Sequence, residues 1–318
     1  MGVDRASVPV WSHGPMRFSV WPLSVHGFAD LAGVVGHCEA TGWDGAYVVD
    51  HFMGNREDDA PDDTPVLEAL TTLAALAAQT ERIRLGPLVL GGTYRHPAVV
   101  AKSAATLDDL SGGRIVLGLG AGWQRNEHRA YGIELPPVKE RMDRFEEGAV
   151  AIRSLLTEDR TTFAGDHVEL TDAPCRPTPP GGRLPILIGA KGERRGLRIA
   201  ARVADEWNSC ATVDQLRHRS EVLARHCDDL GRDPAEIRRS TQAFVRLVDD
   251  SAEADRLRSE PSSRPRLIGT VGEVVDQIGA YAEVGLDELI VPDWDMGTGA
   301  QRLEALDRIQ RDVAPAFR

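Results

Sequence analysis

The feature that most constrains the fold is a short apolar run followed by a helical segment, a pattern that recurs eight times along the chain. Strands that alternate with helices pair in parallel through right-handed crossovers. Eight such units in 318 residues predict an α/β protein with a closed (β/α)8 TIM barrel, which typically occupies about 250 residues plus insertions. The predicted strands are 17–21, 45–49, 83–90, 114–119, 184–188, 206–208, 238–248 and 288–291.

An open doubly wound sheet is the main alternative, and the positions of the glycines argue against it. Such a sheet needs a dinucleotide-binding glycine fingerprint after its first strand. The nearest candidate, 118–122, follows the fourth run and has Trp123 where the third glycine belongs. We therefore predict one barrel domain over 16–318 and a loose extension over 1–15. Within the domain we predict helices over 65–80 and 125–157, and insertions near 160–182, which can accommodate a hairpin, and near 249–270.

Composition excludes several classes of partner and chemistry. The net charge of −12 argues against nucleic acid or an anionic membrane as the main partner. The first fifteen residues hold no apolar signal-peptide core, so we expect a cytoplasmic protein. Four cysteines without a C-x-x-C pair indicate free thiols. The nine histidines form neither H-x-H nor H-E-x-x-H, so no metal site is predicted.

The active site of such a barrel lies at the C-terminal ends of its strands, so the residues after each apolar run are candidates. Asp50 and His51 follow the second run. An imidazole there can hydrogen-bond a cofactor or pass a proton near neutral pH; a capping aspartate beside a structural histidine explains the pair equally well. After the third run, Gly91 precedes Tyr94 and Arg95, which indicate either substrate contacts or a tight turn.

Two further loops carry small or basic residues. Gly120, Ala121 and Gly122 leave room for a ring system beside the indole of Trp123, although close helix–strand packing explains the glycines too. The segment 189–195 opens a helix and contains Lys191, one of three lysines in the chain, next to several arginines. Free N–H groups at a helix start bind phosphate, so this loop is either a phosphate site or a solvated helix face.

Taken in order, these segments resemble the luciferase-like monooxygenase superfamily, and more closely its actinobacterial deazaflavin (coenzyme F420)-dependent oxidoreductases. The resemblance runs from about residue 16 to the end. It rests on the blocks Val49-Asp50-His51-Phe52, Tyr94-Arg95-His96-Pro97, 110–114 leading into 118–123, Gly192-Glu193-Arg194-Arg195 with 204–208, and 269–270 with 285–290.

The resemblance implies a cofactor lying across the strand ends, with His51 as the catalytic residue that orients the ring or relays a proton. It also implies a non-proline cis peptide at about Leu88–Val89 behind the ring, a small-molecule substrate and a possible homodimer. The cofactor-binding residues it implies are Asp50, His51, Leu88, Val89, Gly91, Gly120, Ala121, Gly122, Gly189, Ala190, Lys191, Gly192, Glu193 and Asn208. The implied substrate pocket is formed by Trp21, Tyr94, Arg95 and Trp123.

Two positions depart from the glucose-6-phosphate dehydrogenases of this group. Trp123 replaces their proton-donating glutamate and Asn55 replaces a tryptophan, so sugar-phosphate oxidation is not expected. The leading hypothesis is hydride transfer between F420 and a small organic substrate with a C=C or C=N bond, or the reverse reaction. The alternatives are an FMN-dependent two-component monooxygenase and a non-catalytic flavin-binding barrel.

Overall fold

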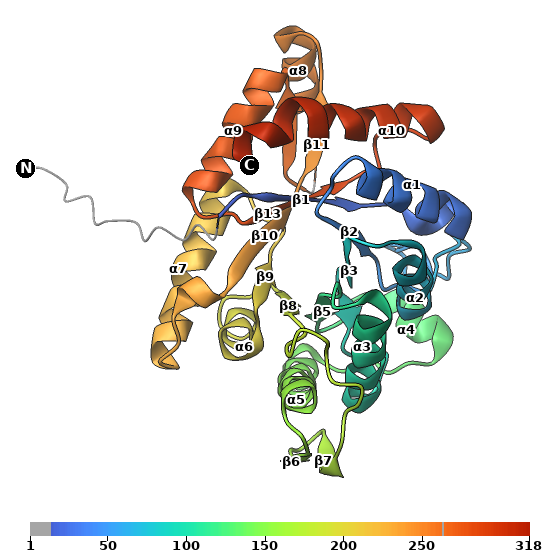
Figure 1. Ribbon diagram of the computed structural model, residues 1–318, viewed down its shortest axis with the longest axis vertical. Helices are drawn as coiled ribbons and strands as arrows, with labels where there is room; N and C mark the ends of the chain where they lie inside the picture. Colours follow the sequence, from blue (N-terminus) through green and yellow to red (C-terminus); the bar gives the residue numbers. More distant parts are fainter. Residues whose placement is uncertain (1–13, 263) are drawn as a thin grey trace, which may run out of the picture.

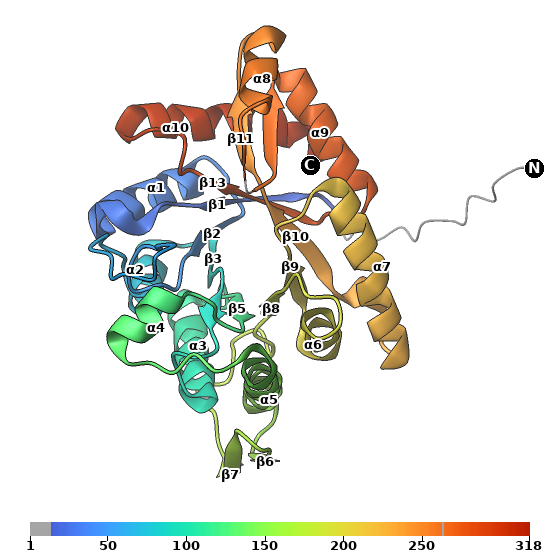
Figure 2. The same cartoon turned by 180° about the vertical axis from the view of Figure 1, so that it is seen from behind.

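The computed structural model describes residues 14–262 and 264–318, and it forms a ring of parallel strands surrounded by helices (Figure 1). The predicted extension over 1–15 lies outside the described residues except for its last two positions. The view from behind shows the same ring with α7 and α3 on its outer surface (Figure 2). The barrel strands are β1 (Arg17–Trp21), β2 (Gly45–Val48), β3 (Arg84–Pro87), β4 (Leu90–Gly91), β5 (Leu117–Gly120), β8 (Ile186–Gly189), β9 (Glu206–Asn208), β10 (Arg238–Gln242) and β13 (Glu288–Pro292).

The barrel closes because β3 and β4 together occupy one strand position. The sheet order is β3-β2-β1-β13-β10-β9-β8-β5-β4, so its two ends are consecutive segments of one stretch of chain. A bridge between Leu85 and Ile115 and the pairing of Leu90 with Leu119 join this stretch to β5. The interruption between β3 and β4 contains the cis peptide Leu88–Val89, at the predicted place. The predicted eight-position barrel is therefore confirmed.

Two predicted helices have different bounds in the structure. The helix predicted from Pro65 begins only at Ala69, because the Glu68 carboxylate accepts a hydrogen bond from the backbone N–H of Thr71 and caps that end. The helix predicted over 125–157 is two helices: Gly132 ends the first in the left-handed region and Pro137 precedes the second. The helices around the barrel are α1 (Phe28–Ala40), α2 (Ala69–Gln79), α3 (Pro97–Ser111), α4 (Arg125–Tyr131), α5 (Val138–Thr157), α6 (Gly196–Val203), α7 (Val213–Asp229), α9 (Val271–Glu283) and α10 (Gly299–Arg308).

Both insertions have defined structure. The first contains the antiparallel hairpin β6 (Thr161–Ala164) and β7 (Glu169–Ala173), which extends beyond α5 in Figure 1. The second contains α8 (Ser251–Arg258) and β12 (Arg266–Gly269). The strand predicted over 238–248 divides at Ala243: β10 stays in the barrel, whereas β11 (Phe244–Leu247) leaves it and pairs in parallel with β12. The insertion therefore supplies the partner strand that an isolated β11 would lack.

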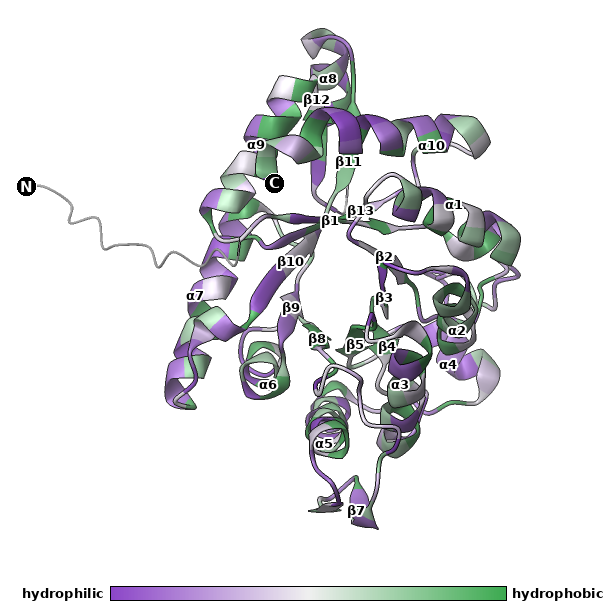
Figure 3. Ribbon diagram, in the orientation of Figure 1, coloured by the Kyte–Doolittle hydropathy of each residue, from purple (hydrophilic) through white to green (hydrophobic). Residues whose placement is uncertain are grey.

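The barrel interior is layered. Near the strand starts lies a buried charged layer, in which Arg17 and Arg84 each contact both Glu206 and Glu288. The next layer is an apolar cluster of Trp21, Tyr47, Leu88, Val116, Leu187 and Ile290. A larger apolar core fills the space between the barrel and the helices, whose hydrophobic and hydrophilic faces alternate in Figure 3. No helix among the described residues is both long enough and apolar enough to cross a membrane.

Candidate active site

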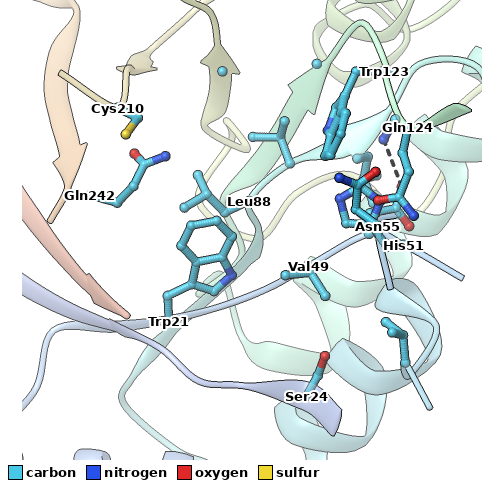
Figure 4. A pocket seen from close by; sticks show the side chains of 18 of the residues that line it. Trp21, Ser24, Val49, His51, Asn55, Leu88, Trp123, Gln124, Cys210 and Gln242 are labelled. Carbon is cyan, nitrogen blue, oxygen red and sulfur yellow. Dashed lines mark hydrogen bonds between the residues drawn. The ribbon is translucent and has the colours of Figure 1, made fainter. Parts of the chain in front are cut away.

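A cavity of about 820 Å³ opens at the C-terminal ends of the barrel strands. Figure 4 shows part of its lining: Trp123, Gln124, His51 and Asn55 gather on one side, and Cys210 and Gln242 lie on the other. All but three of the predicted site residues line it. Those that do are Trp21, Asp50, His51, Leu88, Val89, Gly91, Tyr94, Gly120, Ala121, Gly122, Trp123, Gly189, Ala190, Lys191 and Asn208.

Arg95 is the first exception and corrects its predicted place in the substrate pocket. Its guanidinium lies on Asp50 in a bidentate ion pair, with both N–O distances at 2.8 Å, and also contacts Glu68. The same Asp50 carboxylate accepts a hydrogen bond from the Gly91 backbone N–H at 2.8 Å. A paired, nearly buried guanidinium is not free to bind substrate, so Arg95 fixes the end of β2 against β4.

His51 is held by a buried carboxylate that sequence reasoning missed. The Nδ1 atom of His51 lies 2.7 Å from Oε1 of Glu127, and the backbone N–H of Phe52 donates to Oε2 at 2.7 Å. The hydroxyl of Tyr94 donates to the same carboxylate. Burial opposes ionisation of Glu127, but these hydrogen bonds outweigh it and hold the pKa of its carboxyl below the ordinary value. Glu127 is therefore a buried anion behind the imidazole.

Glu127 belongs to a group of buried polar residues on α4 and the turn before it, which we call the 124–128 clamp: Gln124, Asn126, Glu127 and His128. Gln124 donates to the carbonyl oxygen of Met53 at 3.0 Å, and Asn126 donates to that of Gly54 at 2.8 Å. His128 forms a 2.7 Å hydrogen bond with the hydroxyl of Thr93. The clamp joins the loop after β2 to the loop after β4. Its sequence signal is weak, because nothing in a polar run distinguishes a buried helix from an exposed one.

One wall of the cavity is a slot for the side chain of Val89. A Cβ atom added at Gly120 would lie 2.6 Å from Cγ2 of Val89, and one added at Gly189 would lie 3.0 Å from Cγ1. Both strands therefore need glycine where they face Val89. Val89 and the two glycines together form a wall of small residues, which is the kind of surface against which a flat ring can lie.

Only part of the loop after β8, where a phosphate site is predicted, lines the cavity. The Ala190 N–H donates to the Asn208 carbonyl at 3.0 Å, which fixes the loop against β9. Lys191 is exposed, lines the cavity, and forms no ion pair within 14–262 and 264–318. Gly192 and Glu193 do not line the cavity; the Glu193 carboxylate lies 3.1 Å from His218 instead.

Arg195, at the end of this loop, has different surroundings from those predicted. Helix α6 begins at Gly196, beyond the loop, and Arg195 pairs with Asp143 and Glu146 on α5. Arg195 is therefore unavailable to an anion in the cavity. The expected basic patch is reduced at the cavity to Lys191.

Another part of the cavity lining contains aromatic side chains, and two of its residues, Trp294 and Arg264, were also missed. The rings of Trp21 and Trp294 lie 4.8 Å apart between centroids, and the guanidinium of Arg264 lies 5.3 Å and 5.0 Å from their centroids. Trp294 follows the last barrel strand, and Arg264 comes from the second insertion. Sequence reasoning assigned no role to either segment, so the strand-end rule alone could have found only Trp294.

The size and lining of the cavity agree with an organic cofactor. The described residues contain no group of three histidine, cysteine or carboxylate side chains able to hold a metal ion. The cavity volume lies within the roughly 300–1,000 Å³ of small-molecule sites. A smooth wall at Val89, an imidazole at His51 and a free cation at Lys191 fit a flat ring that carries a phosphate.

Comparison with known proteins places this fold and site in one family. Residues 15–265 match the model of the luciferase-like monooxygenase family. The chain belongs to this family. It is 31% identical to the F420-dependent glucose-6-phosphate dehydrogenase of Intrasporangium calvum over 94% of this chain and 98% of that protein.

Solved structures that hold F420 or FMN share the fold. An F420-dependent secondary alcohol dehydrogenase in complex with an F420–acetone adduct matches with a TM-score of 0.80 at 20% identity, covering 96% of this chain and 99% of that one. The oxygenating constituent of the 3,6-diketocamphane monooxygenase from Pseudomonas putida, in complex with FMN, matches with a TM-score of 0.74 at 18% identity, covering 95% and 98%. At these identities the likeness establishes the fold alone.

Proposed function

We propose that this protein is an F420-dependent oxidoreductase that transfers a hydride between the deazaflavin and a small organic substrate. The observation that carries the proposal is a smooth wall around Val89 and the imidazole of His51 lining the same cavity. The full-length likeness to a relative named for F420 supports the choice of cofactor.

The bound deazaflavin would supply or accept the hydride, and the residues of the cavity provide the rest. Val89, Gly120 and Gly189 form the wall for the ring, and Lys191 holds the phosphate. His51 exchanges a proton with the substrate or orients the ring. The apolar cluster beneath the cavity keeps water from that side.

The substrate side supports a conjugated molecule rather than a sugar phosphate. Trp123 lies edge-on to His51 with 5.5 Å between ring centroids, where an indole N–H can donate a hydrogen bond but cannot act as an acid. Trp21 and Trp294 add an aromatic surface to the cavity lining. We therefore propose an activated C=C or C=N bond as the reacting group, reduced in one direction or formed in the other.

The second candidate is an FMN-dependent monooxygenase, which the shared fold of an FMN-bound structure favours. The two candidate functions are distinguished by titrating purified protein with F420 and with FMN while absorbance and fluorescence are followed. F420 binding at micromolar or lower Kd, with FMN binding at least about tenfold weaker, supports the proposal. Tight FMN binding without F420 binding overturns it.

A matched variant separates an enzyme from a cofactor carrier. Reduced F420 is mixed with a panel of enones and imines, and its reoxidation without oxygen is followed. His51→Ala should lose turnover by about a hundredfold, the scale of general acid–base catalysis, while still binding F420. Equal turnover by the variant would remove His51 from the mechanism, and no turnover by the wild type with any substrate class would favour a non-catalytic barrel.

A further inference from the structure

The Glu127 carboxylate determines which nitrogen of His51 faces the cavity. We infer that Glu127 is a positioning residue: it keeps a proton on Nδ1 of His51, so that Nε2 is the atom that exchanges a proton with substrate. The assignment of the tautomer rests on the hydrogen bonds around Glu127 and on the negative charge of its carboxylate. Its catalytic consequence rests on the proposed function.

The donors around Glu127 leave His51 no other arrangement. The Phe52 backbone N–H can only donate, so it occupies Oε2, and the Tyr94 hydroxyl donates to Oε1. Burial and the neighbouring carboxylate raise the pKa of Tyr94, so its hydroxyl keeps its proton. The ionised Glu127 carboxylate accepts hydrogen bonds and donates none. Nδ1 of His51, 2.7 Å from Oε1, must therefore carry a hydrogen.

The other ring nitrogen is the one available to substrate. His51 lines the cavity, its side chain is 26% exposed, and Nε2 forms no hydrogen bond to any of the described residues. Neutral His51 thus presents a lone pair at Nε2, whereas protonated His51 presents an N–H there. Further charges nearby are the paired Asp50 and Arg95, which lie behind Tyr94.

This arrangement supports proton transfer in both directions. When a substrate is oxidised, the hydride carries both electrons from carbon to the deazaflavin, and the proton from the adjoining heteroatom or carbon passes to Nε2. When a substrate is reduced, Nε2–H returns that proton to the atom next to the one that receives the hydride. In either direction the buried anion of Glu127 stabilises the imidazolium, as a carboxylate does when it orients a catalytic histidine.

The first test reads the tautomer in the protein without cofactor. Protein labelled with ¹⁵N at histidine is titrated while the ring nitrogens are observed by NMR, and His51 is identified from the signals missing in His51→Gln. The expected result is a neutral imidazole with a protonated Nδ1 and an unprotonated Nε2. A neutral His51 with its proton on Nε2 overturns the inference. Because this measurement needs no cofactor, it holds even if F420 binding fails.

The second test removes the charge and keeps the shape. Glu127→Gln should shift His51 toward the Nε2–H tautomer that free imidazoles favour. In the loaded enzyme, kcat should fall by about tenfold or more, a smaller loss than the roughly hundredfold or greater effect of removing the proton-transfer group itself, while the Kd for F420 changes by less than about threefold. An unchanged tautomer in Glu127→Gln overturns the positioning role.

The matched control is Glu147→Gln. Glu147 lies on α5 and accepts hydrogen bonds from the backbone N–H groups of His167 and Val168 in the hairpin, away from the cavity. The Glu147→Gln substitution should leave the NMR signals of His51 and the kcat unchanged. If Glu127→Gln does not fold, the wild-type spectrum alone decides the tautomer, and Tyr94→Phe, which removes one donor from Glu127 and keeps the ring, should leave the proton on Nδ1.

Discussion

Replacing Gly120 by alanine should displace the wall on which the cofactor ring is proposed to lie. The added Cβ would lie 2.6 Å from Cγ2 of Val89, whereas carbon atoms in contact prefer about 3.5–4.0 Å. The two groups must therefore separate by about 1 Å. Val89 cannot recede toward β8, because its Cγ1 already lies against the position of Gly189. The remaining direction is into the cavity.

The cost follows from this displacement. Overpacking of a well-packed site typically costs about 1–3 kcal/mol, and we expect the free energy of unfolding to fall by that amount. A side chain moved into the cavity also occupies space that the ring needs, so the affinity for F420 should fall by about tenfold or more, equivalent to about 1.4 kcal/mol.

The assay is a double-mutant cycle with Val89→Ala. Urea denaturation gives stability and F420 titration gives affinity for the wild type, both single variants and the double variant. Val89→Ala should relieve the effect of Gly120→Ala, which appears as a coupling energy of about 1 kcal/mol or more. The control is Gly36→Ala on α1, where an added Cβ meets nothing within 4 Å and alanine should stabilise the helix by about 0.5–1 kcal/mol. Additive effects of Gly120→Ala and Val89→Ala on stability and on F420 affinity would refute the reasoning.

Three further predictions concern charges. Glu288→Gln removes one anion from the buried layer and leaves Arg17 and Arg84 with only Glu206, so urea denaturation should show a loss of about 3 kcal/mol; a loss below about 1 kcal/mol would mean that the layer tolerates unbalanced charge. Lys191→Met should weaken F420 binding by about threefold to tenfold and flatten its dependence on salt; an unchanged salt dependence would place the phosphate elsewhere. Burial raises the pKa of Asp293 to about 6, so between about pH 4 and 6 the folded state holds a proton that the unfolded chain has lost, and the free energy of unfolding should fall as the pH rises through this range. The Asp293→Asn substitution should remove that decrease. Equal slopes of unfolding free energy against pH for the wild type and the variant would contradict the prediction.

The strand-to-helix rhythm was sufficient to predict the barrel, because parallel strands with crossover helices leave few other arrangements. It could not predict where β10 ends and β11 begins. The segment 238–248 contains no glycine or proline that would mark a break, and only the pairing of its second half with β12, about twenty residues further on, separates that half from the barrel. Pairing between distant segments is not encoded in local periodicity, which explains the error.

The candidate site was also predicted only in part. Residues directly after strands, such as His51 and Gly120, follow from the rule that barrel sites lie at strand ends. Glu127 lies in a helix, and Arg264 in an insertion, so neither could be placed by that rule. Arg95 was misplaced for a different reason: the sequence gives no sign that Asp50, forty-five positions earlier, neutralises it.

The 124–128 clamp has a consequence for engineering. Gln124 and Asn126 hold the loop after β2 through the backbone carbonyl oxygens of Met53 and Gly54, and Glu127 holds it through the side chain of His51 and the backbone N–H of Phe52. Neighbouring positions that face the cavity, Asn55 and Trp123, can therefore be varied in a combinatorial library without loosening the loop. A library limited to these two positions should yield mostly folded proteins with altered substrate preference, whereas randomising the clamp itself should yield mostly inactive ones.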